Sequence, residues 1–211
     1  MGRSTLNFTP APAIPRTARF PDDAQEPMAR KGMGAVYTRT ADSQPLRAEP
    51  SADERARLLS RFYEPHHARL TAAVDAALAA HGRCLVFDGH SFPSRPLPYE
   101  DDQDPDRPDI CLGTDPFHTP AVLADAAVRT LQDQGWKVAL NRPFSGALVP
   151  MRFYGKDRRV ESLMVEVNRS LYMNEATGER LSCLENVRSR IGRSIAKLCK
   201  CVNPVVPREG A

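Results

Sequence analysis

The chain has 211 residues, enough to bury a sizeable core without disulfide or metal staples. Hydrophobic residues make up 41% and charged residues 26%, a balance that excludes a fibrous chain and a wholly disordered one. The net charge of +3 is too small to indicate nucleic acid or a membrane surface as the partner. No apolar run approaches the roughly 20 residues that span a bilayer.

The cysteines and the first residues point to a reducing compartment. Five cysteines form an odd, scattered set, which argues against a disulfide framework: Cys84, Cys111, Cys183, Cys199 and Cys201. The first 15 residues lack an apolar core of signal-peptide length. We therefore expect a cytoplasmic protein.

The first half of the chain begins irregular and then becomes helical. Five prolines within residues 1–32 predict a flexible arm and a surface loop, and residues 35–38 are a short strand candidate. Ser51, with Glu54 three residues later, forms a capping box that opens a helix. A second helical stretch is expected to begin at Pro65 and to end at Gly82.

The middle of the chain predicts a buried strand followed by a long loop. Residues 84–87 are a continuous apolar run, typical of a strand buried on both faces, and it should end at Asp88. Residues 93–109 are polar and rich in proline. This segment is too long for a simple connection, so it is either disordered or a functional loop.

Helices and strands alternate in the second half. We expect a helix over 121–134, strands over 137–140 and 162–168, and a long amphipathic helix over 181–198. This alternation predicts an α/β fold with a largely parallel sheet covered on both sides. Ligands bind beyond the carboxyl ends of such strands, where the sequence places the polar segments DGHS, NRPFSG and NRSLY.

Two residues stand out in these strands. His90 follows a buried strand and lies two residues from Asp88, so it is either a zinc ligand oriented by a carboxylate or a loop-anchoring hydrogen-bond group. Glu166 lies inside the apolar run LMVEV, where a carboxylate is costly to bury. It is either a general base or the partner of a buried arginine such as Arg142 or Arg169.

Six strings, in order, resemble the N-formylglutamate amidohydrolase family over residues 19–200: GMGAVYTR, FYEPHHARL, VFDGHSFPS, DICLGTD, NRPFSGALVP and VEVNRSLYMNEATG. The resemblance implies a three-layer α/β/α fold with a mostly parallel or mixed sheet, similar to zinc carboxypeptidases. It also implies zinc-dependent hydrolysis of N-formyl-L-glutamate to formate and L-glutamate, in histidine degradation.

The same resemblance assigns roles to individual residues. His90 matches a zinc ligand of the family and Glu166 matches its general base. A dianionic substrate needs cationic partners, and we expect Arg142 first and Arg169 second, with a hydrogen bond from Asn141. For each arginine the alternative is a surface charge or a structural ion pair.

The resemblance is incomplete at the amino terminus. Family members carry an earlier strand, a PHSG-like turn and an acidic residue, and a catalytic zinc usually needs three protein ligands. We expect the chain to lack this segment and to be impaired. Alternatively, His118, Asp88 or Asp109 completes an altered site. The expected organisation is an arm over 1–18, the family domain over 19–201 and a disordered tail over 202–211.

Three other functions remain as alternatives. The same fold could be a non-catalytic remnant or binding module. A basic carboxyl-terminal helix could bind phosphates, but Arg190, Arg193 and Lys197 recur at helical spacing on its outer face, which is typical of a solvated surface. Cys199 and Cys201 with His66 and His67 could hold a structural metal, although a lone CxC is a weak signal. We expect no nucleic acid and no membrane partner.

Overall fold

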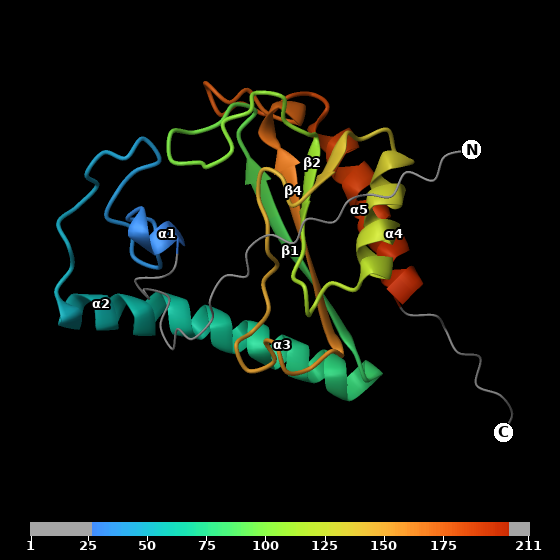
Figure 1. The fold of residues 1–211 in the computed structure, drawn as a ribbon, viewed down its shortest axis with the longest axis horizontal. Helices are drawn as coiled ribbons and strands as arrows, with labels where there is room; N and C mark the ends of the chain where they lie inside the picture. Colours follow the sequence, from blue (N-terminus) through green and yellow to red (C-terminus); the bar gives the residue numbers. More distant parts are fainter. Residues whose placement is uncertain (1–26, 203–211) are drawn as a thin grey trace, which may run out of the picture.

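The computed structural model describes residues 27–202, which form a mixed four-stranded sheet with helices on both faces (Figure 1). Its strands are β1 (Cys84–Phe92), β2 (Ile110–Gly113), β3 (Val138–Leu140) and β4 (Val160–Asn168), in the order β1-β4-β2-β3. The pairs β1–β4 and β2–β3 are parallel, whereas β2 runs antiparallel to β4. The expected arm over 1–18 and the tail beyond Val202 lie outside the described residues.

Helices α4 (Ala121–Gln132) and α5 (Leu184–Val202) pack on one face of the sheet (Figure 1). Side chains alternate between the faces of a strand, so Leu163 and Val165 of β4 point to these helices. They share a buried cluster with residues of β2, α4, the turn after α4, and α5: Ile110, Leu112, Ala127, Leu131, Trp136, Val187 and Leu198. This cluster is the main core.

Helix α3 (Glu64–His81) covers only part of the opposite face. Its Val74 and Leu78 pack with Val160, at the beginning of β4, and with Val86 of β1. The second core cluster is completed by the segment over 149–154. The predicted three layers are therefore confirmed, but among the described elements no helix packs over the carboxyl-terminal half of β1 and β4 on this face.

The two predicted amino-terminal helices form one continuous rod. Ser51 accepts a hydrogen bond from the Glu54 amide, as the capping box predicts, and opens α2 (Ala52–Leu58). A π-helical turn, η1 (Leu59–Tyr63), joins α2 to α3. The wider turn lies just before Pro65, whose ring lacks an N–H and would crowd a regular turn. Gly82, with a φ of 71°, ends α3 as expected.

The prediction of a strand over 35–38 is wrong. A four-residue helix, α1 (Pro27–Arg30), is followed by a loop in which Thr38 and Arg39 donate their amides to the Gly32 carbonyl. The loop carries only isolated bridges, such as Met33 with Tyr37. No described strand lies beside this short run, so it forms no ladder.

The structure also differs from the sequence-based prediction at two strands of the sheet. β1 continues through residues 88–91 to Phe92 and lies at the edge of the sheet. Its first five residues are only half-buried, so it is not the strand buried on both faces that was expected. β2 was missed, because its four residues follow a proline-rich segment and look like a loop. All four β2 residues are buried, since β3 and β4 flank the strand.

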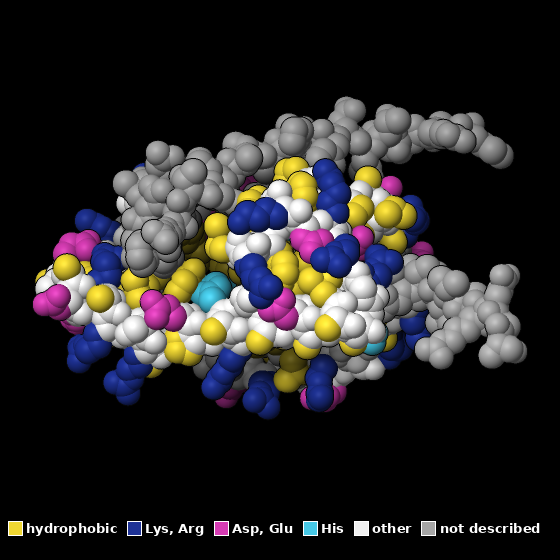
Figure 2. All heavy atoms as spheres, turned by 90° about the horizontal axis from the view of Figure 1, so that it is seen from below, with side chains coloured by type: hydrophobic (Ala, Val, Ile, Leu, Met, Phe, Trp, Pro, Cys, Tyr) yellow, Lys and Arg dark blue, Asp and Glu magenta, His cyan; other side chains and the backbone are white. Residues whose placement is uncertain are grey.

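The surface around the rod of α2, η1 and α3 carries mixed charge. Figure 2 shows Lys and Arg side chains along this face, interrupted by Asp, Glu and hydrophobic side chains, with no continuous basic patch. Within residues 27–202, no helix combines the length and the apolar character that a membrane crossing requires.

Candidate active site

His90 and Glu166 meet on adjacent strands. The β1–β4 register pairs His90 with Glu166 and Asp88 with Met164. Directly paired residues of neighbouring strands point to the same face, so the side chains of Asp88, His90 and Glu166 share the face that α3 leaves uncovered. The carboxyl ends of β1 and β4 therefore bring together two of the predicted site residues.

The Glu166 carboxyl is buried, and one of its oxygens has no described partner. Its side chain lies in the middle of the sheet, flanked by β1 and by Cys111 of β2, and Oε2 has no hydrogen-bond partner among the described residues. Burial raises the pKa of this carboxyl, and the nearby His90 partly offsets the rise. A carboxyl with an upshifted pKa and a free oxygen has the properties of a general base.

Cys111 does not compete for this role. Burial raises the pKa of its thiol to about 11, so the thiol is neutral at physiological pH. Its sulfur donates to the Phe144 carbonyl at 3.2 Å. The residue acts here as a small apolar group that packs beside Glu166.

His90 is the exposed member of the group. Its Nε2 lies 2.9 Å from Oδ1 of Asp88, and its side chain is 50% exposed. A carboxylate on one ring nitrogen fixes the orientation of the imidazole and leaves the other nitrogen for a ligand. The pairing of Asp88 with His90 that the sequence indicates is present.

The loop over 93–109 has a defined structure and is held at the end of β1. Inside it, the Arg107 guanidinium is almost fully buried; it donates to Glu100 and to the Pro93 carbonyl. The same guanidinium lies 5.8 Å from the Phe92 ring centroid and 5.9 Å from that of Phe144. This buried pair anchors the loop at the end of β1, so the loop is structural rather than disordered.

Sequence reasoning missed this anchoring pair. The signal available was an isolated Glu-Asp-Asp run followed by an arginine in a segment too long for a connection. The Glu100 charge also adds to the upward shift of the Glu166 pKa, so the loop belongs to the electrostatic surroundings of the site.

Arg142 and Asn141 face other partners in this structure. Arg142 Nε donates to Asp102 at 2.9 Å and its NH2 group donates to Asp104, both in the 93–109 loop. The Asp104 amide and the Arg142 guanidinium hold the pKa of Asp102 below its usual range. Asn141 exchanges hydrogen bonds with Thr114, accepting from its amide at 2.9 Å and donating to its hydroxyl at 2.8 Å.

Arg169 is the predicted cation whose charge acts on the Glu166 carboxyl. It begins the short 3-10 helix η2 (Arg169–Leu171), directly after β4. Its guanidinium donates to the hydroxyl and to the carbonyl of Ser91, each at 3.1 Å. Its positive charge lowers the pKa of the Glu166 carboxyl, against the effect of burial.

The described residues do not complete a metal site. Within residues 27–202, no group of three or more His, Cys, Asp and Glu side chains could hold a metal ion. His118 is buried beside Val160, where Nδ1 donates to the Val160 carbonyl and Nε2 accepts from the Gly155 amide. Asp109 accepts from the Lys137 amide at 2.8 Å. Of the suggested additional ligands, only Asp88 lies beside His90.

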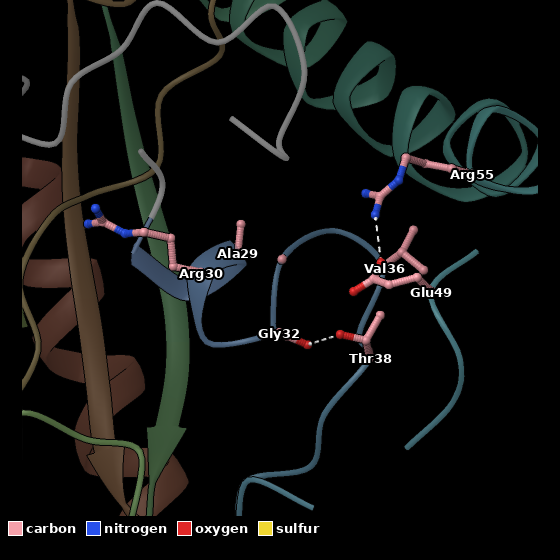
Figure 3. Close-up of a pocket in the computed structure, with 8 residues that line it drawn as sticks. Ala29, Arg30, Gly32, Val36, Thr38, Glu49 and Arg55 are labelled. Atoms are coloured by element: carbon pink, nitrogen blue, oxygen red, sulfur yellow. Dashed lines mark hydrogen bonds and ion pairs between the residues drawn. The ribbon is translucent and has the colours of Figure 1, made fainter. Parts of the chain in front are cut away.

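Two surface hollows lie away from these residues. One, of about 270 Å³, is lined by α1, the following loop and α2, where Arg55 lies 3.6 Å from Glu49 (Figure 3). The other, of about 640 Å³, follows α2 and η1. No predicted site residue lines either hollow.

The family now follows from comparison with known proteins. A model of the N-formylglutamate amidohydrolase family matches residues 17–173. The chain belongs to this family. An N-formylglutamate deformylase of Pseudomonas aeruginosa is 28% identical over 181 residues, which cover 83% of this chain and 66% of the relative.

Solved structures support the same family and fold. The crystal structure of an N-formylglutamate amidohydrolase from Ralstonia eutropha matches with a TM-score of 0.69 at 27% identity, covering 82% of this chain and 63% of that protein. A gene product of Agrobacterium tumefaciens matches with a TM-score of 0.50 at 20% identity, which supports the fold alone. The chain thus spans slightly less than two thirds of the length of the Pseudomonas aeruginosa and Ralstonia eutropha relatives.

Proposed function

We propose that the chain carries the proton-transfer part of a site that hydrolyses the amide bond of N-formyl-L-glutamate or a similar N-acyl amino acid. The observation that carries the proposal is the buried Glu166 carboxyl, with a free Oε2, beside His90 on the adjacent strand. The names of the two relatives, a deformylase and an amidohydrolase, support this reaction class.

In this proposal Glu166 moves the proton. Its carboxylate accepts a proton from the attacking water as the new carbon–oxygen bond forms, and then donates it to the leaving nitrogen as the carbon–nitrogen bond breaks. The products are formate and L-glutamate. The upshifted pKa of Glu166 suits both steps, because a carboxyl that titrates nearer neutral pH can accept and release a proton at similar cost.

The proposal gives the anionic substrate a cationic partner in Arg169, with Arg142 as the second. Arg169 acts on Glu166 electrostatically and uses two donors on Ser91, which leaves part of its planar fork for a carboxylate. Arg142 would first have to leave Asp102 and Asp104. Asn141 would have to leave Thr114.

Zinc remains part of the proposal only through His90, which Asp88 orients. Three protein ligands are usual for a catalytic zinc, and residues 27–202 do not supply them. We therefore derive no step through the metal. A place in histidine degradation and a cytoplasmic location belong to the same proposal.

One observation favours a second function. The incomplete donor set of residues 27–202 would suit a binding module that keeps the family fold and recognises an anionic N-acyl amino acid without cleaving it. In that case N-formyl-L-glutamate would bind, and no formate would form.

A formate-release assay with added zinc separates the two. If Glu166 is the base, Glu166→Gln should lower the turnover by about 10²–10⁴-fold while the fold persists. Glu161→Gln is the matched control, since Glu161 lies on the same strand but pairs with Arg83 on the other face. Binding without release by the unaltered chain favours the binding module, and equal turnover in both variants contradicts the role of Glu166.

A further inference from the structure

Residues 101–106, within the loop that follows β1, form a strap that is held by side chains (Figure 1). Every residue of the strap except the half-buried Asp102 is exposed. None of its amides donates to the backbone carbonyl of a described residue. The Asp104 and Asp106 amides donate instead to the side chains of Asp102 and Asp104, at 2.9 Å and 2.8 Å. The conformation of the strap therefore depends on its carboxylates.

Cations from other parts of the chain hold the same carboxylates. Arg142, just after β3, donates from Nε to Asp102 at 2.9 Å and from Nη2 to Asp104. The other two pairs each join a lysine outside the strap to one of its acids: Lys137 with Asp106, and Lys31 with Asp101. Asp102 and Asp104 thus have two tasks, because they shape the strap and they bind Arg142.

The ion pair at the two ends of the strap is of another kind. The side chains of Glu100 and Arg107 are each 2% exposed, whereas that of Arg142 is 54% exposed and that of Lys137 is 55% exposed. Separating a buried pair leaves an uncompensated charge in the interior. An exposed pair contributes little and is screened by salt. The ends at 100 and 107 should therefore stay in place under conditions that release the exposed pairs.

Two further bonds tie the strap to this buried pair. Arg107 donates to the Asp102 carbonyl at 3.3 Å, and the Gln103 side chain donates to the Glu100 carbonyl at 2.7 Å. Both lie in the first half of the strap. Release should therefore be largest in its second half, at Asp104 and Asp106.

The strap lies in the loop that belongs to the surroundings of the candidate site. The Glu100 carboxylate at its base contributes to the raised pKa of Glu166. While the strap is closed, Nε and Nη2 of Arg142 are both used by acids of the same chain. Opening the strap therefore decides whether this guanidinium is available to another anion.

We propose that residues 101–106 are a charge-held strap, which occupies Arg142 at low ionic strength and opens about the buried Glu100–Arg107 pair as the salt concentration rises. Each exposed pair should favour the closed strap by about fivefold or less. Together the pairs therefore give a balance that salt can shift. This inference rests on the ion pairs of the loop and not on the proposed activity.

Hydrogen exchange of the full 211-residue chain, followed at single residues, tests the strap. Raising the sodium chloride concentration from about 0.02 M to about 0.5 M should speed exchange of the Asp104 and Asp106 amides by about three- to tenfold. The Ala176 amide is the internal control, since it donates to the neutral side chain of Asn174 at 3.0 Å in another exposed turn. Its exchange should change by less than about twofold.

Substitutions of two exposed arginines give the matched comparison. Arg142→Gln should speed exchange at Asp104 and Asp106 by about three- to tenfold at low salt and should weaken the further effect of salt. Arg142→Lys keeps the charge but loses the fork, so its exchange should lie between the two. Arg152→Gln breaks an exposed pair with Asp75 of α3 and should leave the strap unchanged. Thermal unfolding shows that each variant still folds.

Each outcome decides the inference. Equal strap exchange in Arg142→Gln and the unaltered chain, a salt effect as large at Ala176 as in the strap, or equal acceleration by Arg152→Gln would overturn it. Should Arg142→Gln fail to fold, the salt response of the unaltered chain, compared with that of Ala176, decides alone. Formate release is measured separately: a strap that opens with salt in a chain that releases no formate contradicts the proposed function and leaves this inference standing.

Discussion

On one face of the sheet, the two halves differ in how completely their polar side chains are hydrogen-bonded. At the beginning of β4, the buried His118 uses both ring nitrogens, and the buried Ser162 donates to the Leu148 carbonyl. At the end of β4, the buried Glu166 keeps one oxygen without a described partner, and its neighbour His90 is half-exposed. The first half is sealed by α3 and the 149–154 segment, whereas the second is bordered by a loop.

The contrast supports the proposal that the polar residues at the end of β4 belong to the site, whereas those at its beginning are structural. Both His118 and His90 accompany Asp residues in the sequence, so residue type alone cannot distinguish them. A buried group with every bond satisfied stabilises the fold, while a buried group with an unused atom beside a half-exposed neighbour is available for a ligand. Substitutions in the two halves should therefore change the unfolding free energy, and its dependence on pH, by different amounts.

The largest effect is expected at His118. His118→Ala leaves the Val160 carbonyl and the Gly155 amide without their partner and opens a cavity, which should cost about 3 kcal/mol of the free energy of unfolding. Urea unfolding gives the value. His81→Ala, at the exposed end of α3, is the control and should change stability by less than about 0.5 kcal/mol. A loss at His118 as small as that at His81 would contradict the structural role.

The next effect tests how the two halves are held together. A Cβ on Gly113 would overlap the Gly146 carbonyl oxygen and the Met164 side chain, so Gly113→Ala should cost about 2 kcal/mol. Gly192→Ala is the control of opposite sign. It lies in α5 with no described atom near the added methyl group, and it should stabilise by about 0.5–1 kcal/mol. Equal melting temperatures for both variants would show that the 141–146 segment adjusts freely.

The sequence predicted elements whose signals are local. The Ser51 cap, the Gly82 stop and the amphipathic helix α5 each depend on a few neighbouring residues. The cap and the stop were confirmed, and α5 is present but begins at Leu184, so the exposed Leu181 lies outside it. The position of β1 at an edge and the four-residue β2 were missed, because strand order depends on contacts far apart in the sequence.

The candidate site shows the same division. The motif around His90 and Glu166 was visible in the sequence, but their pairing across two strands required the register of the sheet. The alternative partner His118 is 28 residues from His90 in sequence, yet its ring bonds to the opposite end of β4. Likewise, nothing local indicated that Arg142 would bind Asp102 and Asp104.

A smaller effect is expected at Glu166, and it depends on pH. Burial raises the pKa of Glu166 in the folded state above its ordinary 4.5, so the folded state holds this proton more tightly than the unfolded state. The stability that the group contributes is present at lower pH and is lost as the pH rises through the raised value. Glu166→Gln removes this dependence, so its unfolding free energy should fall less between pH 4.5 and neutral pH than that of the unaltered chain.

Unfolding curves collected over this pH range measure the difference. All other titrating groups are common to both proteins, so subtracting the two curves isolates Glu166. Glu161→Gln, on the opposite face, should follow the unaltered chain. Parallel curves for the unaltered chain and Glu166→Gln would contradict an upshifted pKa, and a difference of the opposite sign would indicate a carboxylate paired with an arginine.

The smallest effect is expected at His90. Its side chain is 50% exposed, and water can replace it as the partner of Asp88, so His90→Ala should change the unfolding free energy by less than about 0.5 kcal/mol. Added zinc gives the second measurement: if His90 is a ligand, zinc should raise the melting temperature of the unaltered chain more than that of His90→Ala. A loss of stability similar to that of His118→Ala, with an equal zinc response, would make His90 a structural residue and would remove the distinction between the two halves of the face.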